Sequence, residues 1–520
     1  MRKLIFYLTF FFPLFSVAQT HDLYFTKGVE LYEKKDYAGA MEYFTKEIEL
    51  NADNLEAYNY KGIIKAQTGD FAAAIDIFTK EISINPNIDV AYADRAYAKL
   101  SLGNFRDAIE DCDKAISINP KSSLAYNNRG NSKNGLGDFN GAIQDFSKMI
   151  ELDPTNAGAY SNRGDSKNAL SEFKDAVEDF NKAIELDAKL PEAYLGRGIA
   201  KGNLKDNYDA IDDFGRAIAL NPDLAPAYFY RGVQKCGFNN FGDAVADFNQ
   251  AITLNPKYTE AFEVRAEANS KLGNYGSALN DLSKAITLNP KNAGAYYNRG
   301  GVEAKLVDYD NAIKDFTQAI SLKDDYAEAY AERGALKLSM KDFSGALTDL
   351  SNAIIFMPDA VEAYLNRALA RIQLHQYGYA LADLNKAISI NTGYAGAYFY
   401  RGLINMQVSN FGAAIPDLNK AIAGSYDLPH AYYMRGFAYA GIKNNKDALT
   451  DLTKAIEQDP SNAGAFFERG RVYYNLNNKT AAKADWVKSA ALGDRDAVMM
   501  LKYPPSKAKP SASNWVVWKK

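Results

Sequence analysis

The sequence predicts an all-α protein, an α-solenoid of about fourteen stacked helical hairpins. The first observation is an aromatic residue that recurs every 34 residues, fourteen times, from Tyr24 to Phe466 without an insertion or deletion. The second is an alanine that follows each of these aromatic residues by sixteen places, from Ala40 to Ala482. A fixed period of roughly 20–50 residues is typical of repeat proteins, whose units stack one on the next.

One repeat, residues 123–156, shows the pattern of a helical hairpin. Apolar and small residues follow helical spacing over Leu124–Leu136, and Gly137-Asp138 interrupts them. A second helical run covers Asn140–Leu152 and ends at Asp153-Pro154, because proline cannot continue a helix. A single hairpin would leave an apolar face in water, so consecutive hairpins must stack.

These residues resemble the tetratricopeptide repeat (TPR) family. The aromatic residue, Gly, Ala, Phe, Ala and Pro of its motif correspond here to Tyr126, Gly130, Ala142, Phe146, Met149 and Pro154, with Met149 as the local departure. The resemblance extends over residues 19–496, in repeats of 34 that start at residue 21. It implies a right-handed superhelix whose first helices line a concave groove.

Residues 1–18 have the pattern of a secretory signal peptide. Arg2 and Lys3 precede an apolar run, and small residues at 16–18 allow cleavage after Ala18. A short membrane anchor is the alternative, although the apolar run is shorter than the ~20 residues that span a bilayer. We therefore expect an exported protein, located in the periplasm, at the cell surface or outside the cell.

Two segments follow the last repeat. Residues 494–502 can form a short helix that caps the last hairpin. Residues 503–520 are rich in Pro, Ser and Lys, a composition that predicts a disordered tail. Because the tail ends in Trp515, Trp518 and two lysines, its alternative roles are a docking peptide or a contact with a membrane surface.

Composition argues against several classes of function. The net charge is −4, and it becomes −6 without the first 18 residues, so nucleic acid is not an expected partner. The three histidines, His21, His375 and His430, lie in different repeats, so neither a metal site nor a histidine base is indicated. Cys112 and Cys236 are four repeats apart, too far for a disulfide. We expect no cofactor and no enzymatic activity.

The seventh place of each repeat is basic, whereas the TPR family usually has a large apolar residue there. Arg occupies this place in repeats three to fourteen, and Asp follows sixteen residues later in the same repeats. Repeats one and two have Lys instead, with Glu twenty residues later. Because acid and base change together, we predict structural ion pairs within each hairpin rather than an anion-binding stripe. Among them are Arg95–Asp111, Arg129–Asp145, Arg163–Asp179, Arg265–Asp281, Lys27–Glu47 and Lys61–Glu81.

A further row of lysines occupies the eleventh place, where an aromatic residue is usual. The row comprises Lys65, Lys99, Lys133, Lys167, Lys201 and Lys235. We expect their stems to cover alanine faces while the ammonium groups reach water.

The fifth, ninth and twelfth places share one face of the first helix, and by the resemblance they look into the groove. Repeats four and five present an amide-rich patch there: Asn127, Asn131, Asn134, Ser161, Asp165 and Asn168. Repeats ten to thirteen present an apolar strip: Leu338, Leu365, Leu369, Ile372, Phe399, Leu403, Met406, Tyr433 and Phe437. The amide patch suits peptide backbone or sugar hydroxyls, or is simply hydrated. The apolar strip marks a partner site if exposed, or else packs neighbouring first helices together.

The sequence thus favours a non-enzymatic scaffold that binds protein or peptide partners through the groove, chiefly on the apolar strip. A glycan-binding or polysaccharide-export accessory protein is the alternative, supported by the amide-rich patch. Membrane contact is expected only through the C-terminal tail.

Overall fold

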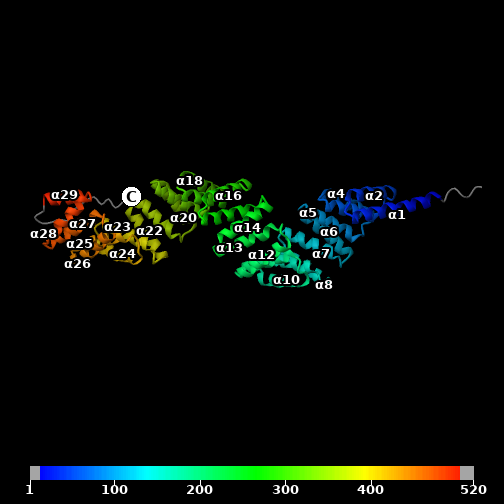
Figure 1. Cartoon of the computed structure of the whole chain (residues 1–520), viewed down its shortest axis with the longest axis horizontal. Coiled ribbons are helices and arrows are strands. Elements are labelled where there is room, and N and C mark those ends of the chain that lie inside the picture. The colour runs from blue at the N-terminus through cyan, green and yellow to red at the C-terminus, as the bar shows by residue number, and fades with distance from the viewer. Residues whose placement is uncertain (1–11, 504–520) are drawn as a thin grey trace, which may run out of the picture. The chain divides into compact units, whose positions relative to one another are not determined.

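The computed structural model describes residues 12–503, which form 29 helices and no strand. The chain divides into two compact bodies, Met1–Ala268 and Asn269–Lys520, and each is described by itself. In both bodies the helices form successive antiparallel hairpins (Figure 1). The prediction of an all-α solenoid of helical hairpins is confirmed. The handedness of its superhelix stays a prediction.

The first body holds the helices of repeats one to seven. They are α1 (Phe12–Glu33), α2 (Tyr37–Leu50), α3 (Leu55–Gln67), α4 (Phe71–Ile84), α5 (Asp89–Ser101), α6 (Phe105–Ile118), α7 (Ser123–Gly135), α8 (Phe139–Leu152), α9 (Ala157–Ala169), α10 (Phe173–Leu186), α11 (Pro191–Asn203), α12 (Asn207–Leu220), α13 (Ala225–Gly237) and α14 (Phe241–Leu254). Helix α15 (Thr259–Lys271), the first helix of repeat eight, contains the boundary between the bodies.

The second body continues the alternation to the closing helix. Its helices are α16 (Tyr275–Leu288), α17 (Ala293–Lys305), α18 (Tyr309–Leu322), α19 (Ala327–Ser339), α20 (Phe343–Phe356), α21 (Val361–Gln373), α22 (Tyr377–Ile390), α23 (Ala395–Gln407), α24 (Phe411–Ala423), α25 (Leu428–Gly441), α26 (Asn445–Gln458), α27 (Ala463–Asn475), α28 (Lys479–Ala491) and α29 (Arg495–Lys502).

The turn inside each hairpin uses a left-handed residue at the fifteenth place of the repeat. In repeat four this residue is Gly137, with φ of 80°, and the N–H of Asp138 then reaches back to the carbonyl of Lys133 at 2.9 Å. This Schellman-type ending satisfies carbonyls that the helix leaves unpaired. The Asp138 carboxylate caps α8 by accepting from the N–H of Gly141 at 2.9 Å.

Most hairpins close around one large buried side chain and small residues opposite it, and in repeat three the smaller Cys112 takes this place. In repeat four Phe146 and Ala142 have no exposed surface. A Cβ atom on Gly130 would lie 2.7 Å from Cε1 of Phe146, closer than the two atoms can approach. The small residue at the eighth place therefore lets the two helices of a hairpin approach each other closely.

Neighbouring repeats stack through their first helices. A second helix packs against its own first helix and against the first helix of the next repeat, as α8 does against α7 and α9 in the first body and α24 against α23 and α25 in the second. Consecutive first helices also touch, as α9 and α11 do in the first body and α23 and α25 in the second. Within residues 12–503, consecutive second helices make no comparable contacts. First helices from α3 to α13 therefore form a continuous surface in the first body, and those from α17 to α21 and from α23 to α27 do so in the second. We call the surface that the first helices present the first-helix face.

The ends of the chain are described only in part. Helix α1 starts at Phe12 and continues past Ala18, the predicted cleavage site. Residues 1–11 of the predicted signal segment lie outside the described residues. At the other end α29 packs on α28, where the sequence indicates a capping helix, and Asp494 caps its first turn. The tail predicted for 503–520 lies outside the described residues after Tyr503. No helix within residues 12–503 is long and apolar enough to span a bilayer.

Candidate partner-binding surface

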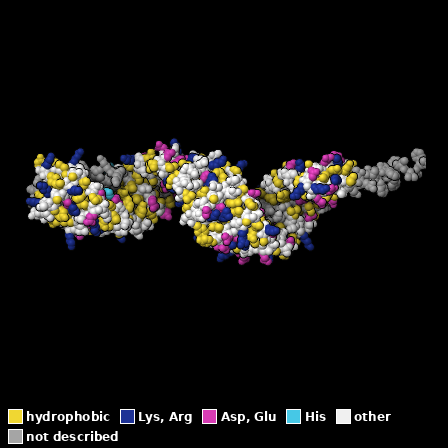
Figure 2. All heavy atoms as spheres, viewed as in Figure 1, with side chains coloured by type: hydrophobic (Ala, Val, Ile, Leu, Met, Phe, Trp, Pro, Cys, Tyr) yellow, Lys and Arg dark blue, Asp and Glu magenta, His cyan; other side chains and the backbone are white. Residues whose placement is uncertain are grey.

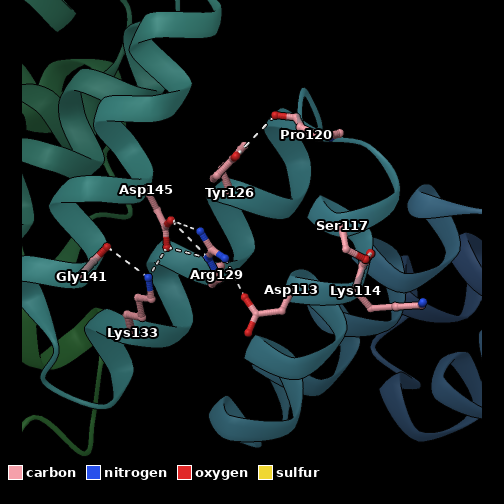
Figure 3. Close-up of polar contacts among 9 residues, drawn as sticks. All are labelled: Asp113, Lys114, Ser117, Pro120, Tyr126, Arg129, Lys133, Gly141 and Asp145. Carbon is pink, nitrogen blue, oxygen red and sulfur yellow. Dashed lines mark hydrogen bonds and ion pairs between the residues drawn. The ribbon is translucent and has the colours of Figure 1, made fainter.

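The arginine at the seventh place holds three helices together (Figure 3). In repeat four, Arg129 of α7 donates from Nη2 to Asp145 Oδ1 of α8 at 2.6 Å and from Nε to Oδ2 at 3.0 Å. Its Nη1 donates to Asp113 Oδ1 of α6, in the preceding repeat, at 2.6 Å. The guanidinium carbon lies 5.4 Å from the ring centroid of Tyr126. We call this arrangement the arginine clamp.

The clamp recurs with the expected register of sixteen residues. The bidentate pairs are Arg95–Asp111, Arg129–Asp145, Arg163–Asp179, Arg197–Asp213 and Arg231–Asp247 in the first body, and Arg299–Asp315, Arg333–Asp349, Arg367–Asp383, Arg401–Asp417, Arg435–Asp451 and Arg469–Asp485 in the second. Arg265 belongs to the first body and Asp281 to the second, so that pair stays a prediction. Because the aspartates are buried, removing one arginine strands a charge at a cost of ~3–5 kcal/mol.

Most of these arginines also donate to a side chain of the preceding repeat, a contact that was not predicted from the sequence. The acceptors in the first body are Thr79, Asp113, Ser147, Asn181 and Asn249, and those in the second are Ser283, Thr317, Ser351, Asn385, Asn419 and Thr453. All stand at the twenty-fifth place, where a short polar side chain recurs, so the signal was present in the sequence. Arg231 is the exception, because Gly215 occupies that place and offers no side chain.

The prediction that the lysine row reaches water is wrong for repeats three to seven. Lys133 Nζ lies 2.8 Å from Asp145 Oδ2, so this carboxylate faces two cations (Figure 3). The same second cation is supplied by Lys99, Lys167, Lys201 and Lys235, and in the second body by Lys337 and Arg371. Lys65 instead pairs with Asp70 at 2.8 Å. The physical reason is that a buried carboxylate keeps one oxygen facing the eleventh place, where a cation stabilises it.

The two pairs predicted for repeats one and two are also wrong. Lys27 pairs with Glu30 of its own helix at 2.7 Å, while Glu47 accepts from Asn54 Nδ2 at 2.8 Å. Lys61 donates to Thr45 Oγ1 at 3.0 Å. Burial and then the neighbouring Asp94 raise the pKa of Glu81 to about 8. Glu47 and Glu81 stand one helical turn after the place that aspartate occupies in the other repeats. At that position the second helix faces the following repeat and not the lysine of its own hairpin.

The apolar strip of repeats ten to thirteen is mostly packed inside the stack rather than exposed. Leu365, Ile372, Phe399, Leu403, Met406 and Phe437 are each less than 10% exposed, and Leu338, Leu369 and Tyr433 are half-buried. The Phe399 ring of α23 lies 5.4 Å from that of Tyr426, which precedes α25. The prediction of an exposed partner site here is wrong, because consecutive first helices approach closely enough to bury these side chains against each other.

The amide-rich patch of repeats four and five makes hydrogen bonds between first helices. Asn162 Nδ2 of α9 donates to Asn127 Oδ1 of α7 at 3.0 Å, and Asn168 Nδ2 donates to the carbonyl of Gly196 in α11 at 2.9 Å. Asn134 Oδ1 accepts from Ser166 Oγ, and Ser161 is buried. Most side chains of this patch therefore join neighbouring repeats. Of the other two, Asn131 is half-buried and Asp165 is exposed.

The first-helix face of the first body keeps an exposed set of acidic side chains. These are Glu56, Asp165, Glu192, Glu260 and Glu267. No Lys or Arg occupies the second, fifth, sixth, ninth or twelfth place in repeats two to eight. Asp165 is exposed yet crowded by protein atoms. This desolvation, together with the nearby Glu192, raises the pKa of Asp165 to about 7. Tyr97, which is 47% exposed, adds an aromatic surface in repeat three.

Charges of both signs occur together elsewhere on the molecule. On the face drawn in Figure 2, Lys and Arg side chains are interspersed with Asp and Glu. Within residues 12–503, no group of three or more His, Cys, Asp or Glu side chains is arranged to hold a metal ion. Burial raises the pKa of Cys112 to about 12 and that of Cys236 to about 11, so neither thiol is an activated nucleophile.

These features define a class of protein, an α-helical repeat scaffold in which successive first helices lie side by side within each body. TPR family models match residues 25–87, 90–122, 123–156, 157–190, 293–326 and 433–497 as tetratricopeptide repeats and 270–307 as a TPR repeat. The chain belongs to the tetratricopeptide repeat family. No curated protein sequence matches it.

Several solved structures are similar in fold. The Cut9–Hcn1 hetero-tetramer of the APC/C aligns with 15% identity and a TM-score of 0.39, over 94% of this chain and 98% of the other. A tetratricopeptide repeat protein from Parabacteroides merdae aligns with 20% identity and a TM-score of 0.42, over 48% and 99% of the two chains. YrrB, a TPR protein with an unusual peptide-binding site, aligns with 24% identity and a TM-score of 0.30, over 36% and 96%.

Proposed function

We propose that this protein is a non-enzymatic scaffold that binds a protein or peptide partner on the first-helix face of the first body. The observation that carries the proposal is the continuous face formed where consecutive first helices touch, with exposed acidic side chains and no base among them. A scaffold needs accessible, varied side chains on a rigid support, and the arginine clamps supply that support.

The charge of this face favours a partner with basic side chains. Asp165, Glu192 and Glu267 are exposed, and Glu192 lies close enough to Asp165 to contribute, after desolvation, to the raised pKa of Asp165. A Lys or Arg side chain from a partner would relieve this repulsion, and complementary charge also speeds association. A glycan partner is less favoured, because most amides that would recognise sugar hydroxyls are hydrogen-bonded within the protein.

Export to the periplasm or the cell surface is part of the same proposal. It is supported by the signal-like composition of residues 1–18, in which two bases precede an apolar run. N-terminal sequencing of the protein from an envelope fraction would test it. A mature chain that begins after Ala18 is expected, and an intact Met1 on a protein retained in the cytoplasm would overturn this part.

The binding proposal is tested with a peptide array that contains Lys/Arg-rich, Asp/Glu-rich and neutral sequences, alongside a glycan array. We expect the full chain to retain the basic peptides and to release them as salt rises, because exposed charges are screened. The variant Asp165→Asn with Glu192→Gln and Glu267→Gln should lose this binding.

A matched control replaces three exposed acids of the second helices, Asp76→Asn with Glu110→Gln and Glu178→Gln, and should bind as the wild type does. Equal loss in the control and in the test variant would show a general charge effect and contradict a first-helix site. Selective retention of glycans would replace the protein partner by the alternative.

A further inference from the structure

Repeat nine departs from the arginine clamp at the place of the second cation. Arg299 of α17 donates from Nε to Asp315 Oδ2 of α18 at 2.6 Å and from Nη2 to Oδ1 at 2.8 Å. At the eleventh place, where Lys337 of repeat ten pairs with Asp349 at 2.8 Å, repeat nine has Glu303. An acid therefore stands where the neighbouring repeat has a base.

The surroundings of Glu303 hold more acid than base. Asp315 and Asp308, both from the second half of the hairpin, repel its charge, and Arg299 is the cation that opposes them. Arg299 is already shared, because its other groups hold Asp315 and Ser283 Oγ. Glu303 Oε2 is buried and has no hydrogen-bond partner within the part of the chain that the structure describes. Burial, followed by Asp315, raises the pKa of Glu303 to about 7.

Charged groups elsewhere on α17 and on α19 act on other residues. Lys305, on the same helix, directs Nζ to Ser270 Oγ at 3.3 Å. Burial, followed by Glu332 and Glu328 of α19, raises the pKa of Tyr297 on α17, and α19 packs against α17. The charged groups that act on Glu303 are Asp315, Arg299 and Asp308.

Two features of the backbone of the same hairpin lower its stability. Val307, at the turn between α17 and α18, has φ of 64°, a left-handed conformation that a β-branched residue adopts only under strain. Gly300 and Gly301 stand together inside α17, and glycine lowers the stability of a helix interior. A Cβ atom on Gly301 would meet nothing within 4 Å, so packing does not require a glycine there.

We propose that repeat nine is a proton-controlled joint, in which protonated Glu303 joins α17 to Asp315 of α18 and loss of that proton loosens the hairpin. In the protonated state the carboxylic acid can donate to the Asp315 carboxylate, as a lysine does in repeat ten. In the charged state two carboxylates share one guanidinium. The strained turn at Val307 makes this hairpin the place where the stack opens first.

The sign of the pH dependence follows from linkage. The folded hairpin raises the pKa of Glu303 to about 7 from its usual 4.5, so the closed state holds a proton that the open state releases. Opening therefore increases as pH rises from about 4.5 to about 7 and becomes constant above that range. One released proton corresponds to nearly tenfold in the opening constant per pH unit within the window.

Hydrogen exchange of the full chain, read by mass spectrometry and corrected for the intrinsic rate at each pH, tests the proposal. Between pH 5.5 and pH 7 the opening constant of peptides from α17 and α18 should rise by more than tenfold, whereas those from α19 and α20 should change little. Glu303→Gln keeps the shape of the side chain without the proton, and it should abolish the pH dependence in α17.

Two further variants exchange the chemistry of the two repeats. Glu303→Lys should protect α17 at pH 8 and remove the pH dependence, while Lys337→Glu should confer it on α19 and α20. Persistence of the wild-type slope in Glu303→Gln would overturn the proposal, as would exchange in α17 that does not change with pH. If Lys337→Glu prevents folding of repeat ten, the comparison of wild type with Glu303→Gln remains decisive.

Discussion

The first-helix contacts of repeats four to six and those of repeats eleven to thirteen use different side chains on the same backbone plan. In the first region α7, α9 and α11 are joined by hydrogen bonds, such as that from Asn162 to Asn127. In the second region α21, α23 and α25 bury Leu365, Phe399 and Phe437. In the first region acidic side chains such as Asp165 and Glu192 stay exposed beside the polar contacts. In the second region the apolar side chains that could bind a partner are buried between first helices.

The clamps of the two regions differ as well. In repeats three to seven each clamp aspartate faces an arginine and a lysine. In the second region repeat eleven keeps a second cation, Arg371, whereas the eleventh place holds Asn405 in repeat twelve and Tyr439 in repeat thirteen. In those two repeats the clamp arginine is therefore the principal cation for its aspartate.

The largest difference is expected when a side chain between first helices is truncated. Phe399→Ala should destabilise its region by ~3–5 kcal/mol, because a buried ring leaves a cavity. Asn162→Ala should cost ~0.5–1.5 kcal/mol, the net value of one hydrogen bond. Local unfolding free energies from hydrogen exchange in α23 and α9 measure both, since repeat arrays need not unfold as one unit. Equal costs would show that the apolar contacts are not the tighter ones.

Removal of a clamp arginine should depend on the second cation. Arg435→Met leaves buried Asp451 without its arginine and should cost ~3–5 kcal/mol, whereas Arg163→Met leaves Asp179 paired with Lys167 and should cost less. Hydrogen exchange in α26 and α10 gives the two values. The control is Arg435→Met with Asp451→Leu, which should recover much of the loss because no charge is stranded. A double variant as unstable as the single one would contradict a buried-charge origin.

The smallest effect concerns the link between repeats that Arg231 lacks. Gly215→Asn should supply the missing acceptor, as Asn181 does for Arg197 at 2.7 Å, and should stabilise α12 and α13 by about 1 kcal/mol. Part of that gain comes from helix propensity alone. A double-mutant cycle with Arg231→Met separates the two parts, because only the hydrogen bond disappears in that background. An unchanged gain in Arg231→Met would mean that no such bond forms.

The parts of this architecture that depend on the 34-residue period could be predicted from sequence. The residue types at the places of Arg129 and Asp145 change together from repeat to repeat. An antiparallel hairpin brings these two places, sixteen residues apart, next to each other on its two helices. The role of Lys133 was missed because lysine at the eleventh place does not follow the aspartate through all repeats. Exposure of Phe399 could not be predicted, because it depends on how closely consecutive first helices approach, which no single repeat encodes.

The most direct test of the account compares side-chain exposure in the two regions without any partner. Hydroxyl-radical footprinting of the full chain, with each rate divided by that of the unfolded chain, reports the accessibility of individual aromatic rings. Tyr97 should be labelled several-fold faster than Phe399 and Phe437, since it is 47% exposed and they are 4% and 9% exposed. Rapid labelling of Phe399 and Phe437 would contradict the account and restore the apolar strip of repeats ten to thirteen as the partner site.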